Sequence, residues 1–91
     1  MYDIEFAPEA QEHMKLLQLH EPMAFKKVYY SFLPELREYP KTGTGHPELL
    51  KGEPEGRWSR RITKKHRLIY QIRETEVLVL VLQAYGHYND K

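Results

Sequence analysis

The sequence of 91 residues contains no cysteine. Disulfide bonds, thiolate zinc sites and a cysteine nucleophile are therefore excluded. Long apolar runs are also absent, since the longest, Val77–Leu82, falls far short of the ~20 residues that a helix needs to span a bilayer. The first residues, Met1–Phe6, are acidic and run directly into Pro8-Glu9, unlike a signal peptide. We therefore expect a cytoplasmic protein that does not enter a membrane.

Paired metal ligands and a phosphate-binding loop are missing as well. The five histidines are scattered along the chain, and no two of them have the spacing of a ligand pair. The Gly43-x-Gly45 segment has neither the strand-to-helix context nor the Lys-Ser/Thr pair of a nucleotide-binding loop. We expect neither a metal nor a cofactor.

The formal net charge of +1 hides an uneven distribution. Basic residues dominate between Lys51 and Arg73, which predicts a surface that faces a polyanion. A solvated hairpin turn would explain the lysines of this segment, but it does not explain arginines that alternate with apolar residues. The candidates for RNA binding are Lys51, Arg60, Arg61, Lys64 and Lys65.

Hydrophobic periodicity predicts helices in the first half of the chain and strands in the second. A kink or an early stop is expected at Pro34, because proline cannot donate the helical hydrogen bond to Tyr30. The predicted elements are a strand over 2–6, helices over 8–19 and 21–36, and strands over 58–63, 66–73 and 76–85.

These elements predict a single domain over residues 1–91 with an α+β fold, in which two N-terminal helices pack on a four-stranded antiparallel sheet. Strand parity assigns Leu68, Tyr70 and Ile72 to the core. The run Val77–Leu82 is apolar on both faces, as is typical of a central strand.

Four residues are candidates for acid–base and phosphate chemistry, although each also has an ordinary structural explanation. Glu48 lies between a proline and two leucines, a setting expected to hold a base rigid and partly dry. Arg67 offers a guanidinium that can clamp a phosphate through two hydrogen bonds. His87 can act as a general acid, and Tyr88 can stack on a base or donate a hydrogen bond.

Three segments resemble the YoeB branch of the RelE/ParE superfamily, the toxins of bacterial toxin–antitoxin modules. They are Gly43-x-Gly45-x-Pro47-Glu48-x-Leu50-Lys51, Trp58-Ser59-Arg60-Arg61-Ile62-Thr63-x-x-His66-Arg67-Leu68-x-Tyr70 and His87-Tyr88. The resemblance spans most of residues 43–88, and its middle segment is highly specific. The first forty residues match only in the pattern of one strand and two helices.

The resemblance implies a RelE-like fold and a ribosome-dependent mRNA endoribonuclease that needs no metal or cofactor. In that family the glutamate of the Pro-Glu loop acts as base, here Glu48, and the arginine of the His-Arg-Leu segment stabilises the transition state, here Arg67. The terminal histidine and tyrosine act as general acid and orienting group, here His87 and Tyr88. Lys51 and Arg61 match basic positions that contact RNA or the scissile phosphate.

The resemblance also implies partners. They are mRNA on the ribosome, with contacts to ribosomal RNA, an antitoxin of the YefM/Phd type whose C-terminal segment wraps the toxin, and a second copy of the chain in a homodimer. One departure from the pattern is the tail Asn89-Asp90-Lys91. It moves the C-terminal carboxylate away from His87 and adds Asp90 nearby, which changes the electrostatics of that histidine.

Two alternatives use the same fold without cutting RNA: a poison of DNA gyrase, as in the ParE branch, or a plain RNA-binding module. Neither needs the four catalytic candidates together. The turn of the basic hairpin has alternatives too. A two-residue turn at Lys64-Lys65 would put Arg60 on the face of Arg67, whereas a three-residue turn would put Arg61 there. The resemblance favours the longer turn.

Overall fold

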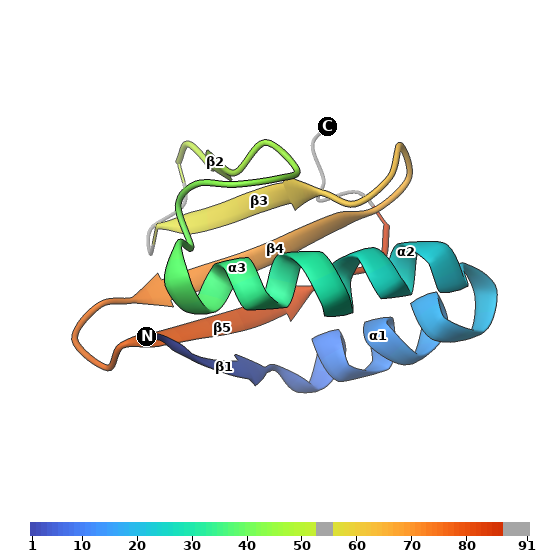
Figure 1. Cartoon of the computed structure of the whole chain (residues 1–91), viewed down its shortest axis with the longest axis horizontal. Coiled ribbons are helices and arrows are strands. Elements are labelled where there is room, and N and C mark those ends of the chain that lie inside the picture. Colours follow the sequence, from blue (N-terminus) through green and yellow to red (C-terminus); the bar gives the residue numbers. More distant parts are fainter. Residues whose placement is uncertain (53–55, 87–91) are drawn as a thin grey trace.

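The computed structural model describes residues 1–52 and 56–86 (Figure 1). Its elements follow one another in the predicted order of strand, helices and strands. In chain order they are β1 (Asp3–Phe6), α1 (Pro8–His20), α2 (Pro22–Lys27), the π-helical segment η1 (Val28–Phe32), α3 (Leu33–Glu38), β2 (Glu48–Leu49), β3 (Arg57–Arg61), β4 (Arg67–Arg73) and β5 (Leu78–Gln83).

The second predicted helix does not stop at Pro34. It continues through α2, η1 and α3 to Glu38, and Figure 1 shows the three as one rod along the sheet. The Leu33 N–H donates to the Val28 carbonyl, five residues back. This wider π-helical turn lies directly before Pro34, the residue that cannot donate a helical hydrogen bond. The expectation of an early stop was wrong.

The sheet has five strands in the order β1-β5-β4-β3-β2. The prediction of four antiparallel strands is wrong in two respects: β1 pairs with β5 in parallel, and the short β2 adds a strand beside β3. Alternating residues predict a half-buried strand but not its direction. β2 consists of only two residues, both exposed, so it has no hydrophobic periodicity from which it could be predicted. β5 lies inside the sheet, as the apolar run over residues 77–82 predicted.

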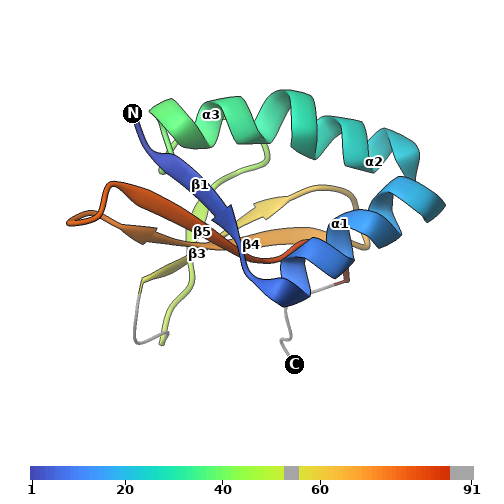
Figure 2. The same ribbon diagram turned by 90° about the horizontal axis from the view of Figure 1, so that it is seen from below.

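The core fills the space between one face of the sheet and the helices. Figure 2 shows the α2–α3 rod running along that side. The predicted core positions Leu68 and Tyr70 are completely buried, and Ile72 packs against the same cluster. They meet helix residues such as Phe32 and Leu36. No helix formed by residues 1–52 and 56–86 has the length and apolar character of a membrane span.

Candidate functional site on the open face of the sheet

Sheet pairing brings Glu48 and Ser59 together on the face that turns away from the helices. Glu48 lies opposite Ser59 across β2 and β3, and Ser59 lies opposite Ile69 across β3 and β4. Residues opposite one another in an antiparallel pair project to the same face. Along β4, Ile69 of this row lies between Leu68 and Tyr70, which face the helices. We call the side of the sheet that carries Glu48, Ser59, Arg61 and Arg67 the open face, because it turns away from the helices; Ser59 and Ile69 on this side are themselves buried.

The basic hairpin has the longer of the two turns considered. The N–H groups of Ile62 and Thr63 both donate to the His66 carbonyl, at 3.0 and 3.1 Å, so three residues form the turn. Arg61 therefore lies directly opposite Arg67 in the β3–β4 pair. The prediction that Arg61 shares a face with Arg67 is confirmed.

Arg67 contacts Ser59 of β3 on one side and Gly86, the last described residue, on the other. Its guanidinium approaches the Ser59 hydroxyl at 3.5 Å, a long contact, and its side chain is half-buried. Its backbone N–H donates to the Gly86 carbonyl at 3.1 Å. In the sequence Gly86 directly precedes His87. His87 and Tyr88 themselves lie outside the described residues.

Glu48 is held by its backbone and open to solvent. It is part of β2, and the Leu50 N–H beyond it donates to the Arg57 carbonyl at 2.8 Å. The side chain of Glu48 is exposed, so the expected partly dry setting is wrong. The prediction failed because its neighbour Leu49 is itself exposed, at 51%. Lys51 follows in a turn and is also exposed.

Arg60 does not lie on the open face with the other candidate cations, so its prediction as an exposed RNA-binding residue was wrong. Its side chain is completely buried on the helix side of the sheet. The guanidinium pairs with the Glu35 carboxylate, and its Nε donates to the Tyr70 hydroxyl at 3.1 Å. It also donates to the carbonyls of Tyr39, Thr42 and Thr44, at 3.0, 2.7 and 3.2 Å. A buried arginine needs such a set of acceptors to offset the loss of its hydration.

The Arg60 network fixes the loop that leads to β2. Burial alone would raise the pKa of Glu35, but hydrogen bonds from Thr44 and Arg60 outweigh it and lower that pKa. A Cβ on Gly43 would collide with the Glu35 carboxylate, and one on Gly45 would lie 2.7 Å from the Phe32 ring. Both glycines also have positive φ angles. The Gly-x-Gly motif therefore lets the loop pack closely against the core.

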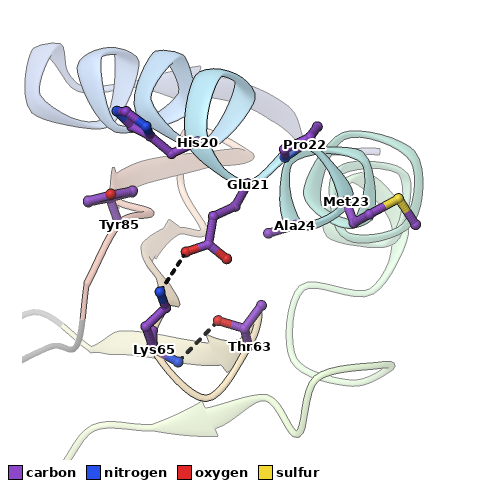
Figure 3. A pocket seen from close by; sticks show the side chains of 8 residues that line it. All are labelled: His20, Glu21, Pro22, Met23, Ala24, Thr63, Lys65 and Tyr85. Atoms are coloured by element: carbon purple, nitrogen blue, oxygen red, sulfur yellow. Dashed lines mark hydrogen bonds and ion pairs between the residues drawn. The ribbon is translucent and has the colours of Figure 1, made fainter.

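The two turn lysines are exposed, but one of them is engaged on the helix side. Lys65 Nζ forms an ion pair with Glu21 at 3.2 Å. Figure 3 shows this pair across a pocket of about 570 Å³. The pocket is lined by residues 20–24 of the α1–α2 corner and by Thr63, Lys65 and Tyr85. Lys64 is exposed at the turn.

Sequence reasoning missed the two histidines that hold the backbone just before His87. His13 and His66 accept hydrogen bonds from residues 84–86. No local pattern predicts these contacts, because they join α1 and the start of β4 to residues far along the chain. Among the described residues, no three His, Asp or Glu side chains gather as a set of metal ligands.

Comparison with known proteins places these features in a family. The model of the YoeB-like toxins of bacterial type II toxin–antitoxin systems matches residues 6–88. The toxin YoeB of Mycobacterium bovis is 34% identical over 88 residues, which cover 97% of this chain and 100% of the relative.

Solved structures agree with this assignment. A YoeB/ParE toxin from Agrobacterium tumefaciens has a TM-score of 0.85 at 28% identity, covering 94% of this chain and 99% of that one. The YoeB dimer of Staphylococcus aureus has a TM-score of 0.81 at 32% identity over 96% and 98%. A YoeB of Staphylococcus aureus in a heterotetrameric complex with YefM has a TM-score of 0.79 at 30% identity over 97% and 99%. The chain belongs to the YoeB-like toxins of type II toxin–antitoxin modules, within the RelE superfamily.

Proposed function

We propose that the chain is a ribosome-dependent mRNA endoribonuclease that stops translation by cutting the message. The observation that carries the proposal is the placement of Glu48, Arg61 and Arg67 on the open face. In addition, the backbone N–H of Arg67 donates to the Gly86 carbonyl. A carboxylate and two cations thus share one side of the sheet, and the backbone just before a histidine is bonded to the strand that carries Arg67. Such an enzyme would act in the cytoplasm, where translation takes place.

RNA carries its own nucleophile, the 2′-hydroxyl, so the enzyme supplies three functions. Glu48 accepts the 2′-hydroxyl proton as the oxygen attacks the adjacent phosphorus. Arg67 balances the negative charge that develops on the phosphate oxygens, and His87 protonates the departing 5′-oxygen. Tyr88 orients the RNA through its ring or hydroxyl. The products are a 2′,3′-cyclic phosphate and a 5′-hydroxyl, and the reaction needs no metal.

The exposed cations around these groups bind the RNA backbone. Arg61 shares the face of Arg67, and Lys51 follows β2 in the chain. Lys64 and Lys65 lie at the hairpin tip, where we place contacts with mRNA or ribosomal RNA. Lys65 would have to leave Glu21 to take part. Arg60 has no role in RNA binding, since its guanidinium is buried.

A cognate antitoxin and a second toxin copy are the expected protein partners. One YoeB structure from S. aureus is a dimer, and another structure from the same organism is a YoeB–YefM complex. We propose that an antitoxin of the YefM/Phd type covers the basic surface with its C-terminal segment. The chain should also form a homodimer. Sedimentation that shows a monomer at every concentration would remove the dimer claim and leave the antitoxin claim standing.

The test is cleavage of mRNA on translating ribosomes by the purified chain. Arg67→Ala and His87→Gln should abolish cutting and growth inhibition while the proteins stay folded. Arg37→Ala is the matched control, because Arg37 is an exposed arginine on α3, on the helix side. A message with one 2′-deoxynucleotide on the 5′ side of the scissile phosphate should resist cutting at that position, since the nucleophile is gone.

Wild-type rates in both Arg67→Ala and His87→Gln would contradict the enzyme proposal. The basic face would then be only a binding surface. Inhibition of DNA gyrase by the wild type, without any mRNA cleavage, would instead favour the gyrase-poison alternative. Both measurements use the same purified protein.

A further inference from the structure

Two histidines from distant parts of the chain hold the last three described residues. The N–H groups of Ala84 and Tyr85 donate to His13 Nδ1 at 3.0 and 3.3 Å. The Gly86 N–H donates to His66 Nδ1 at 2.7 Å. His13 is part of α1, and His66 directly precedes β4. We call this pair the histidine clamp.

The hydrogen bonds define the protonation state of both rings. A backbone N–H can only donate, so each Nδ1 must be unprotonated and each Nε2 must carry the hydrogen. His66 Nε2 lies 2.7 Å from the Glu21 carboxylate, and His13 Nε2 lies 3.7 Å from Glu9. Hydrogen bonds from His66 and then from Lys65 lower the pKa of Glu21. Glu21 therefore stays ionised and favours the Nε2–H form of His66.

The clamp is enclosed by aromatic and charged groups. The Tyr85 ring stacks on His66 with centroids 4.5 Å apart and lies tilted against His13 at 6.2 Å. The side chains of His66 and His13 are only 5% and 16% exposed. Tyr85 and Glu21 also line the pocket of Figure 3, together with His20. The titratable and charged groups around the clamp are Glu9, His20, Glu21, Lys65 and Tyr85.

We propose that the histidine clamp positions the C-terminal catalytic segment by fixing where the chain leaves the sheet at Gly86. The proposal rests on the proposed function, in which the next residue, His87, is the general acid. The clamp acts through the backbone, so His13 and His66 are positioning residues. The Gly86 carbonyl accepts from the Arg67 N–H, which ties the same point to the arginine that balances the phosphate charge. Gly86 has a φ of 87°, which glycine adopts without strain.

The experiment compares His66→Leu and His66→Asn with the wild type in single-turnover cleavage of ribosome-bound mRNA. Leucine removes the acceptor, whereas the asparagine oxygen can accept a hydrogen bond in the place of Nδ1. His20→Leu is the matched control, because His20 is an exposed histidine beside the same pocket. Circular dichroism establishes that each variant is folded.

His66→Leu should lower the cleavage rate by about 10²-fold, the scale expected when a catalytic group is misplaced by about 1 Å. Ribosome binding should not change. His66→Asn should recover most of that rate, because its side-chain oxygen restores the acceptor for the Gly86 N–H. A purely structural role for His66 predicts no such rescue, since asparagine replaces neither the ring that stacks on Tyr85 nor the contact with Glu21. Cleavage by His66→Leu at the wild-type rate would overturn the proposal.

A second measurement does not depend on catalysis. Hydrogen exchange of the Gly86 amide, followed by NMR in the full chain, should be slow in the wild type and in His66→Asn and fast in His66→Leu. Equal exchange in wild type and His66→Leu would refute the clamp. If the wild type does not cut mRNA, the proposed function fails, and the Gly86 amide still decides whether His66 holds the backbone.

Discussion

Replacing Arg60 should destabilise the fold rather than remove a direct contact with RNA. Arg60→Met keeps most of the side-chain volume but removes every polar contact of the guanidinium. The change leaves the Glu35 carboxylate, which is 26% exposed, without its arginine partner. It also removes the donor for the Tyr70 hydroxyl and for three backbone carbonyls of residues 39–44.

The cost follows from these contacts. Removing one partner of a buried ion pair destabilises proteins by roughly 3–5 kcal/mol. A small domain has a total stability of about 5–15 kcal/mol, so Arg60→Met should remove a large share of it. For a domain of this size each kcal/mol lowers Tm by roughly 4–8 °C, so the melting temperature should fall by at least about 12 °C.

The assay is thermal and urea unfolding followed by circular dichroism, with Arg61→Met as the control. Arg61 is the neighbouring arginine, and it is exposed on the open face. Its replacement should change stability by no more than about 0.5 kcal/mol, as for most surface substitutions. It should instead impair cleavage of ribosome-bound mRNA. An Arg60→Met protein as stable as the wild type, with impaired RNA cleavage, would refute the structural role and restore the RNA-binding one.

Three further predictions concern other parts of the molecule. Glu48→Gln should lower the rate of mRNA cleavage by ~10²–10⁴-fold, because the amide cannot accept the 2′-hydroxyl proton; single-turnover cleavage measures this, and a rate near wild type would remove Glu48 as the base. Glu35 has a lowered pKa, so its stabilising effect is present above the ordinary value of 4.5 and is lost as the pH falls through the lower folded pKa. Urea unfolding between neutral and acid pH should show this loss, and Glu35→Gln should abolish it; an identical pH dependence in both would contradict the assignment. Gly45→Ala should cost roughly 1–3 kcal/mol, because its φ of 81° strains any L side chain and its Cβ meets Phe32; unchanged urea unfolding would count against it.

Local periodicity predicted the parts of the fold that depend on neighbouring residues. The helices and the core face of β4 are set by residues close in sequence. The pattern left the length of the hairpin turn open, and only the family resemblance favoured the three-residue turn that the structure has. The direction of β1 and the existence of β2 depend on distant pairing, which no local pattern contains. The candidate site divides in the same way. A motif nominated Glu48, Arg61 and Arg67 as candidates, and the sheet register places them on one face. Contacts across the fold determine that Arg60 is internal.

One sequence signal for the buried arginine was present. Trp58, Arg60 and Ile62 have the same strand parity, and in the three-residue register that parity faces the helices. Neighbouring residues of a strand project to opposite faces. Placing Arg61 on the open face therefore places Arg60 on the helix side. Strand parity does not predict which groups accept hydrogen bonds from the buried guanidinium. These acceptors belong to α3, the 39–44 loop and Tyr70.

Two of the polar networks among the described residues fix the two ends of the candidate site. Arg60 binds the loop that precedes β2, and the Gly45 carbonyl of that loop accepts from the Arg61 N–H at 2.7 Å, so the buried arginine determines where Glu48 begins its strand. The histidine clamp holds Gly86 in the same way on the other side of Arg67. Neither network touches RNA in the proposed mechanism. Variants that damage either one should therefore misplace a catalytic group while the basic surface remains intact, and ribosome binding should outlast cleavage in both.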